Sequence, residues 1–139
     1  YLIYIPDKRY CFDNFKNEST IEDVLSMYYN KSQFHSIKSI ILGHLYSTHN
    51  NPKLHWNNEH GKFNDSDYVK RLKSVINLYE TETIKNKKYI DIHSLYLTPE
   101  SFQKIIKILY ELEFIDLKID KIYPTLKNTF EFYVVLKKT

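Results

Sequence analysis

The sequence of 139 residues has no alanine, only two glycines and a single cysteine. The lone Cys11 excludes an intrachain disulfide framework and a cysteine-based zinc site, and it favours a reducing compartment. We therefore expect a cytoplasmic protein. The isolated Gly43 and Gly61 leave no glycine-rich turn of the kind that cradles a phosphate or a dinucleotide. The longest apolar runs have four or five residues, so we expect neither a membrane span nor a signal peptide.

Arginine is also scarce, because eighteen lysines accompany only Arg9 and Arg71. A sequence with this bias uses lysine wherever a generic positive charge suffices, so Arg9 indicates a planar, bidentate donor. The net charge of +3 is mild and the lysines are spread along the chain, so they form no nucleic-acid patch, and we expect no nucleic-acid partner. The length predicts one domain, and an apolar content of 42% supports a single core.

The apolar stretch Tyr1–Ile5 predicts a strand that is covered on both faces, since its apolar residues do not alternate with polar ones. Pro6 cannot donate to a ladder, so strand pairing should fail there. The polar cluster that follows then lies beyond the carboxyl end of the strand, where open α/β sheets place their ligands. The alternative is a turn whose charges pair among themselves. The predicted substrate-binding residues are Asp7, Lys8, Arg9 and Asp13.

Helical periodicity predicts helices in the middle of the chain, at about 19–30, 32–47 and 65–81. Ser19 and Glu22 form a capping-box pattern at the start of the first helix. Residues 48–64 are polar and predict a loop without structure of its own, which is more often a lid or a binding loop than a plain connector. Trp56 in this loop is a further candidate for substrate binding.

The last third of the chain predicts an extended segment, a helix and two strands. Residues 89–97 are the extended segment, and Thr98 with Pro99 marks a helix start. Alternation at 115–120 and the apolar residues 129–136 predict two strands that pair as an antiparallel hairpin.

Asp91 and His93 are the candidate catalytic residues. They are two apart in an extended segment, which places both side chains on one face. A carboxylate beside an imidazole can fix its tautomer, and the imidazole can then take a proton from an attacking hydroxyl. The alternative is a structural histidine bonded to a backbone carbonyl. The spacing of the loop histidines His49, His55 and His60 fits no standard zinc pattern, so no metal site is predicted.

Three groups of residues resemble a known family: Pro6-Asp7-Lys8-Arg9-Tyr10-x-Phe12-Asp13, then Asp91-x-His93 before Thr98-Pro99-x-Ser101-Phe102, then Pro124-Thr125 with Glu131-Phe132-x-Val134-x-Leu136. They are similar to the C-terminal half of bacterial class I S-adenosylmethionine-dependent methyltransferases. The subgroup is one often associated with surface-polysaccharide or glycosyltransferase gene clusters. Residues from about 14 to 88 are unmatched in detail.

The resemblance implies an α/β, partial Rossmann-like fold in a single domain, 1–139. Its three-stranded mixed sheet would have the order first, last, middle, with a C-terminal antiparallel hairpin. Residues 14–88 would be a helical insertion or cap, and 89–139 the closing helix and hairpin. The resemblance further implies S-adenosylmethionine as cofactor of a longer parent protein, and a sugar or other small polar acceptor. The family's cofactor loop lies in its N-terminal half, so we expect this chain alone neither to bind the cofactor nor to be active.

Two other functions stay open. The first is a non-catalytic carbohydrate- or protein-binding module of a multidomain, glycosyltransferase-associated protein. The second, weaker one is an RNA-contacting domain, for which binding would fall steeply with salt. The chain begins inside a predicted strand, so we also expect that Leu2–Ile5 has an open edge through which two copies can associate.

Overall fold

The computed structural model describes residues 1–139 and has a mixed α/β architecture of five α-helices and one three-stranded sheet. The strands are β1 (Leu2–Pro6), β2 (Leu117–Tyr123) and β3 (Glu131–Lys138). The helices are α1 (Ile21–Asn30), α2 (Ile37–Leu45), α3 (Pro52–Trp56), α4 (Tyr68–Leu78) and α5 (Pro99–Glu111). A 3₁₀ turn over Lys8–Tyr10 follows β1, and π-helical turns over Tyr79–Lys85 follow α4.

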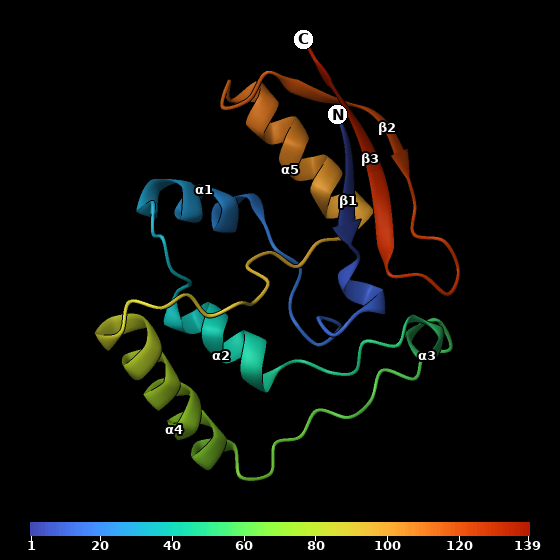
Figure 1. Ribbon diagram of the computed structural model, residues 1–139. Coiled ribbons are helices and arrows are strands. Elements are labelled where there is room, and N and C mark those ends of the chain that lie inside the picture. Colours follow the sequence, from blue (N-terminus) through green and yellow to red (C-terminus); the bar gives the residue numbers. More distant parts are fainter.

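The strand order in the sheet is β1-β3-β2, which confirms the predicted order of first, last and middle strand. The C-terminal hairpin is also confirmed. The prediction of a mixed sheet is wrong, because β3 is antiparallel to both of its neighbours. β1 and β2 run in the same direction on either side of β3, so their carboxyl ends lie at the same end of the sheet (Figure 1).

Pro6 lies inside β1, opposite Glu131 of β3, so the expectation that pairing fails at this residue is wrong. Tyr1 exchanges both of its backbone hydrogen bonds with Leu136. Hydrogen-bonded residues alternate along an antiparallel pair, so the odd-numbered residues of β1 bond β3 and the even-numbered ones face the open edge. The nitrogen of Pro6 therefore faces outward and costs the ladder no bond.

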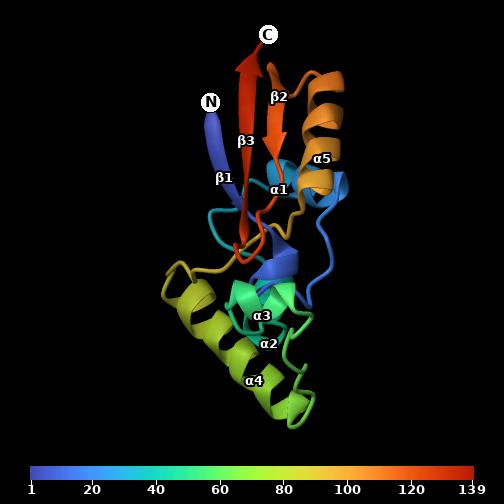
Figure 2. The ribbon, with the colours of Figure 1, turned by 90° about the vertical axis from the view of Figure 1, so that its right-hand side faces the viewer.

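One face of the sheet packs against α5 and the other is open. In Figure 2 the three strands lie side by side with no helix in front of them. The buried residues of the packed face are Phe132, Val134 and Leu136. Ile3 and Ile5 pack against them, whereas Leu2 and Tyr4 point the other way and are 55% and 59% exposed. The expectation that Tyr1–Ile5 is covered on both faces is therefore wrong for this chain.

The helical part of the chain has an apolar core of its own, whose buried residues are Ile40, Leu45 and Val75. Gly43 belongs to this packing, because a Cβ there would lie 2.7 Å from the side chain of Ile92. The segment 89–97 connects the two cores: Ile90 and Ile92 pack into the helical core, and Leu97 packs into the core of the sheet. None of the helices is long and apolar enough to cross a membrane.

The first two helices begin later than the sequence predicts, for local reasons. The capping box of α1 uses Thr20 and Asp23, because the hydroxyl of Ser19 accepts a hydrogen bond from the Tyr96 amide instead. The second helix starts only at Ile37, after Ser36 has capped its first turn.

The connecting segments also differ from their predictions. The loop 48–64 contains the short helix α3, which Asn51 caps and Pro52 begins. The chain beyond α4 continues in the π-helical turns over Tyr79–Lys85, so the helical part extends past the predicted end at 81. The segment 89–97 joins no sheet and has a single parallel bridge, between Asp7 and Leu97. The helix start at Thr98 is confirmed, since its hydroxyl accepts from the amide of Ser101.

Candidate functional site

The carboxylate of Asp7, directly after β1, is fully buried and bonded within the chain. Its Oδ1 accepts from the Nε of Arg9 at 2.9 Å, and its Oδ2 accepts from the Nη2 of Arg9 at 2.7 Å. The Thr125 hydroxyl donates to the same Oδ2 at 2.6 Å. The hydrogen bonds to Asp7 raise the pKa of the Arg9 guanidinium above its usual value. Arg9 is the bidentate donor that the sequence indicates, and its partner in this structure is Asp7.

A second buried carboxylate, Asp13, contacts two basic side chains. The Nζ of Lys16 lies 2.5 Å from its Oδ1, and the Nδ1 of His93 lies 2.6 Å from its Oδ2. Both Asp13 and Lys16 are almost fully buried. Burial alone would raise the pKa of Asp13, but the hydrogen bonds from His93 and Lys16 outweigh it, and the pKa lies below its usual value. Asp13 is therefore an anion that holds His93 in place.

His93 is the residue of this group that a ligand can reach. A carboxylate only accepts hydrogen bonds, so the Nδ1 of His93 donates to Asp13 and the lone pair of the neutral ring is on Nε2. The His93 side chain is 37% exposed and its Nε2 has no partner in the chain. Asp91, the predicted carboxylate partner, is exposed and bonds no histidine. The pairing of a carboxylate with His93 is thus present, with Asp13 as the carboxylate.

Lys8 and Trp56, the remaining predicted substrate-binding residues, contact other parts of the chain. The Nζ of Lys8 donates to the carbonyl of Asn14 at 3.0 Å, and partial burial lowers the pKa of its ammonium. The Trp56 indole stacks on Tyr10 with ring centroids 4.0 Å apart, and its N–H donates to the Thr129 carbonyl at 2.9 Å. Trp56 therefore fastens α3 to the turn before β3.

The single thiol and the loop histidines are held by internal contacts. Burial raises the pKa of Cys11 to about 12, so this thiol is not a nucleophile at neutral pH. His55 is buried, and its Nε2 donates to the His49 carbonyl at 2.9 Å. Its Nδ1 lies 2.9 Å from the Nδ1 of His60. No group of three or more histidine, cysteine or acidic side chains has a geometry that could hold a metal ion.

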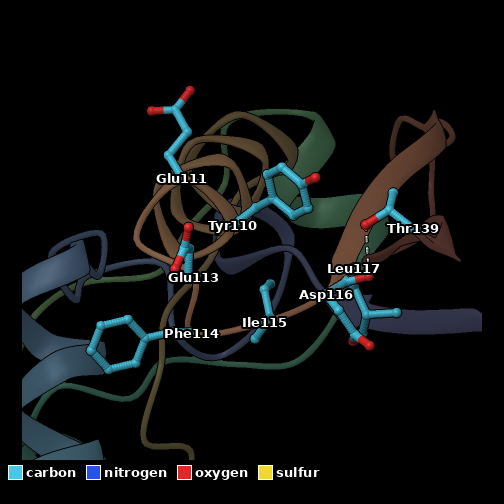
Figure 3. Close-up of a pocket in the computed structure, with 8 residues that line it drawn as sticks. All are labelled: Tyr110, Glu111, Glu113, Phe114, Ile115, Asp116, Leu117 and Thr139. Atoms are coloured by element: carbon cyan, nitrogen blue, oxygen red, sulfur yellow. Dashed lines mark hydrogen bonds between the residues drawn. The ribbon is translucent and has the colours of Figure 1, made fainter.

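Two cavities lie away from the pair of Asp13 and His93. The larger, of about 730 Å³, is an open hollow between the end of α5 and the start of β2. Figure 3 shows the side chains that line it, among them Glu111 and Glu113. The other cavity, of about 510 Å³, lies between α1, α2 and the segment that follows Lys88, and polar side chains line most of it.

Sequence reasoning did not identify Lys16 and Thr125 as parts of this site. The spacing of three between Asp13 and Lys16 is the one local signal, because that spacing brings side chains together on a helical turn. Thr125 lies 118 positions from Asp7 in the sequence, and only the fold brings them together. Comparisons of this chain with protein-family models, with curated proteins and with solved structures found no match.

Proposed function

We propose that this chain is the substrate-side, C-terminal portion of an S-adenosylmethionine-dependent methyltransferase that acts on a sugar or another small polar acceptor. The contact between Asp13, in the chain that follows β1, and His93 is the observation that carries the proposal. The strand order with an antiparallel last strand in the middle supports it. The proposal expects β1 to be covered on both faces, but its outer face is exposed in this chain. The proposal therefore requires that other residues cover this face in the parent protein.

The chemistry assigned to this chain is the activation of the acceptor. Methyl transfer from a sulfonium is a direct displacement, which mainly requires alignment of the acceptor and the donor. A hydroxyl acceptor also has to lose its proton. The lone pair on the Nε2 of His93 takes that proton, and the buried anion of Asp13 stabilises the resulting imidazolium. Asp13 is a positioning residue, because it is buried and acts through its hydrogen bond with His93.

The residues of this chain do not fit the cofactor. Gly43 is packed against the side chain of Ile92, and Gly61 stands alone with a φ of 81°, so the two glycines do not form the glycine-rich loop that the resemblance implies for the cofactor. We assign no step on this chain to S-adenosylmethionine, and we expect titration calorimetry to show no binding of it. Stoichiometric binding of S-adenosylmethionine would show that this chain contains the cofactor site and would refute the assignment.

The catalytic part of the proposal is tested in the protein expressed from its full coding sequence, with labelled S-adenosylmethionine. We expect His93→Gln to lower kcat by about 10²- to 10⁴-fold, the usual contribution of a general base. His44→Gln is the matched control, because His44 is exposed on α2 and bonds nothing. Asp91→Asn tests which carboxylate is the partner of His93. If Asp13 is the partner, kcat of Asp91→Asn should equal that of the wild type. Methyl transfer that survives His93→Gln would exclude the base role.

The second candidate is a carbohydrate-binding module, and the polar cavity beside α1 and α2 is the observation that favours it. Sugar binding without methyl transfer by the full-length protein would support the module over the enzyme. In both cases we place the protein in the cytoplasm. Self-association through the open edge of β1 is also proposed, since Tyr1, Leu2 and Tyr4 are exposed there.

A further inference from the structure

The cavity of about 510 Å³ between α1, α2 and the segment 89–97 has the size of a small-molecule site. It is distinct from the pair of Asp13 and His93. Ser94 and Tyr96 line the cavity, whereas His93 does not.

The chemistry of the lining fits a neutral ligand that is rich in hydroxyl groups. Serine, asparagine and glutamine side chains, which both donate and accept hydrogen bonds, make up half of the lining. A hydroxyl group of a ligand has the same dual capacity. The charged side chains are Glu18 and Asp23 with a single lysine, Lys38, so the cavity does not select an anion. Phe34 and Tyr89 add aromatic surface for the apolar face of a sugar ring.

One wall of the cavity is a fixed chain of hydrogen bonds. The Ser94 hydroxyl lies 2.7 Å from the Nδ1 of His35, and the Nε2 of His35 lies 2.6 Å from the Tyr89 hydroxyl. Burial lowers the pKa of His35, so the ring is neutral at neutral pH and one of its nitrogens accepts while the other donates. The two hydroxyls are thereby oriented in advance and keep capacity for a ligand.

A polar group without a partner remains on the same cavity. Tyr96 is only 6% exposed, and its hydroxyl is a buried polar group with no hydrogen-bond partner. A buried group of this kind is rare in folded proteins, because leaving it unpaired costs free energy. Asn17 and Gln33 also line the cavity, and both are exposed, so their amide groups are accessible to a ligand. A ligand hydroxyl would supply the partner that the Tyr96 hydroxyl lacks.

We propose that this cavity binds a small, neutral, polyhydroxylated molecule such as a mono- or disaccharide, held by Ser94, Tyr96 and the side chains around them. The inference deepens the second candidate function, since it names the ligand class and the side chains that hold the ligand, and it does not rest on the methyl-transfer proposal. It therefore stands if this chain contributes to no methyltransferase.

The test is a nuclear magnetic resonance titration of the ¹⁵N-labelled chain with D-glucose, D-galactose, N-acetylglucosamine and maltose. We expect at least one of these sugars to shift the amide signals of residues 33–35 and 94–96 in a saturable way. Inorganic phosphate is titrated in parallel and should shift none of them. Saturable binding of phosphate instead of sugar, shifts confined to other regions, or no shift with any of the four sugars would overturn the inference.

Two variants test the named side chains. Tyr96→Phe removes only the unpaired hydroxyl, so the variant should fold, and its sugar affinity should fall about two- to tenfold, the range for one hydrogen bond. Ser94→Ala should have a similar effect. Tyr123→Phe, on the sheet and outside the cavity, is the matched control. Equal affinity of Tyr96→Phe and the control would overturn the assignment of that hydroxyl to the ligand.

Discussion

The ion pair of Asp13 and Lys16 is expected to contribute strongly to stability, and Asp13→Asn tests this. Lys16 is 3% exposed, and Asp13 is its only ion-pair partner. Its ammonium also lies over the rings of Phe12 and Tyr96. Removing one partner of a buried pair costs about 3–5 kcal/mol, because a charge stays buried without its counter-ion. Folded domains have a total stability of about 5–15 kcal/mol, so the variant should lose a large part of it.

A double-mutant cycle isolates the ion pair from the other contacts of Asp13. The cycle uses Asp13→Asn, Lys16→Met and the double variant, each unfolded with urea at pH 7 and followed by circular dichroism. The double variant contains no unpaired charge, so the coupling free energy should be about 3 kcal/mol. Lys107 and Glu111 form an exposed pair at 3.8 Å whose coupling should be about 0.5 kcal/mol or less. Equal coupling for the two pairs would refute the reasoning from burial.

Three further predictions concern stability and association. The folded-state pKa of Asp13 lies below its unfolded value, so its contribution to the free energy of unfolding is complete above about pH 4 and is lost as the pH falls through the folded pKa. Urea titrations at a series of pH values should therefore show that the stability of Asp13→Asn falls less steeply in acid than that of the wild type. Leu2→Pro should change stability by about 1 kcal/mol or less and weaken self-association in light scattering, whereas Ile3→Pro should cost about 3 kcal/mol, because only the Ile3 amide bonds β3. A monomeric wild type at all concentrations would exclude the association. Trp56→Phe should lower stability by about 1–2 kcal/mol in thermal unfolding, since one hydrogen bond and a stacked ring are lost.

The sequence predicts well those parts of the fold that depend only on residues close together in the chain. Thr98 and Pro99 start a helix because a hydroxyl cap and a first-turn proline act within one turn. The hairpin follows from two strands joined by a short turn, and its place in the sheet agrees with the predicted order. Pro6 shows the limit of such rules. A proline breaks a ladder only where its nitrogen faces the partner strand, and the sequence does not tell which way it faces.

The candidate site was predictable in part. The sequence indicates that His93 has a carboxylate partner, and spacing within the segment favours Asp91. The partner in the structure is Asp13, which is 80 positions away, and no local pattern reports a contact at that separation. The bidentate role of Arg9 was predictable from the scarcity of arginine, whereas its partner was not. Charge pattern identifies residues that need a partner, and the fold decides which partner each one receives.

The segment 89–97 links the two apolar cores, the helical one and the one under the sheet, and His93 lies near its midpoint. Ile92 is anchored among the helices, Leu97 is anchored under the sheet, and Asp13 reaches His93 from the chain after β1. The orientation of the His93 imidazole therefore depends on how the two cores are placed relative to each other. Val75→Ala removes packing from the helical core, which Ile92 also contacts. We therefore expect this substitution to change the position of His93, although Val75 does not belong to the site.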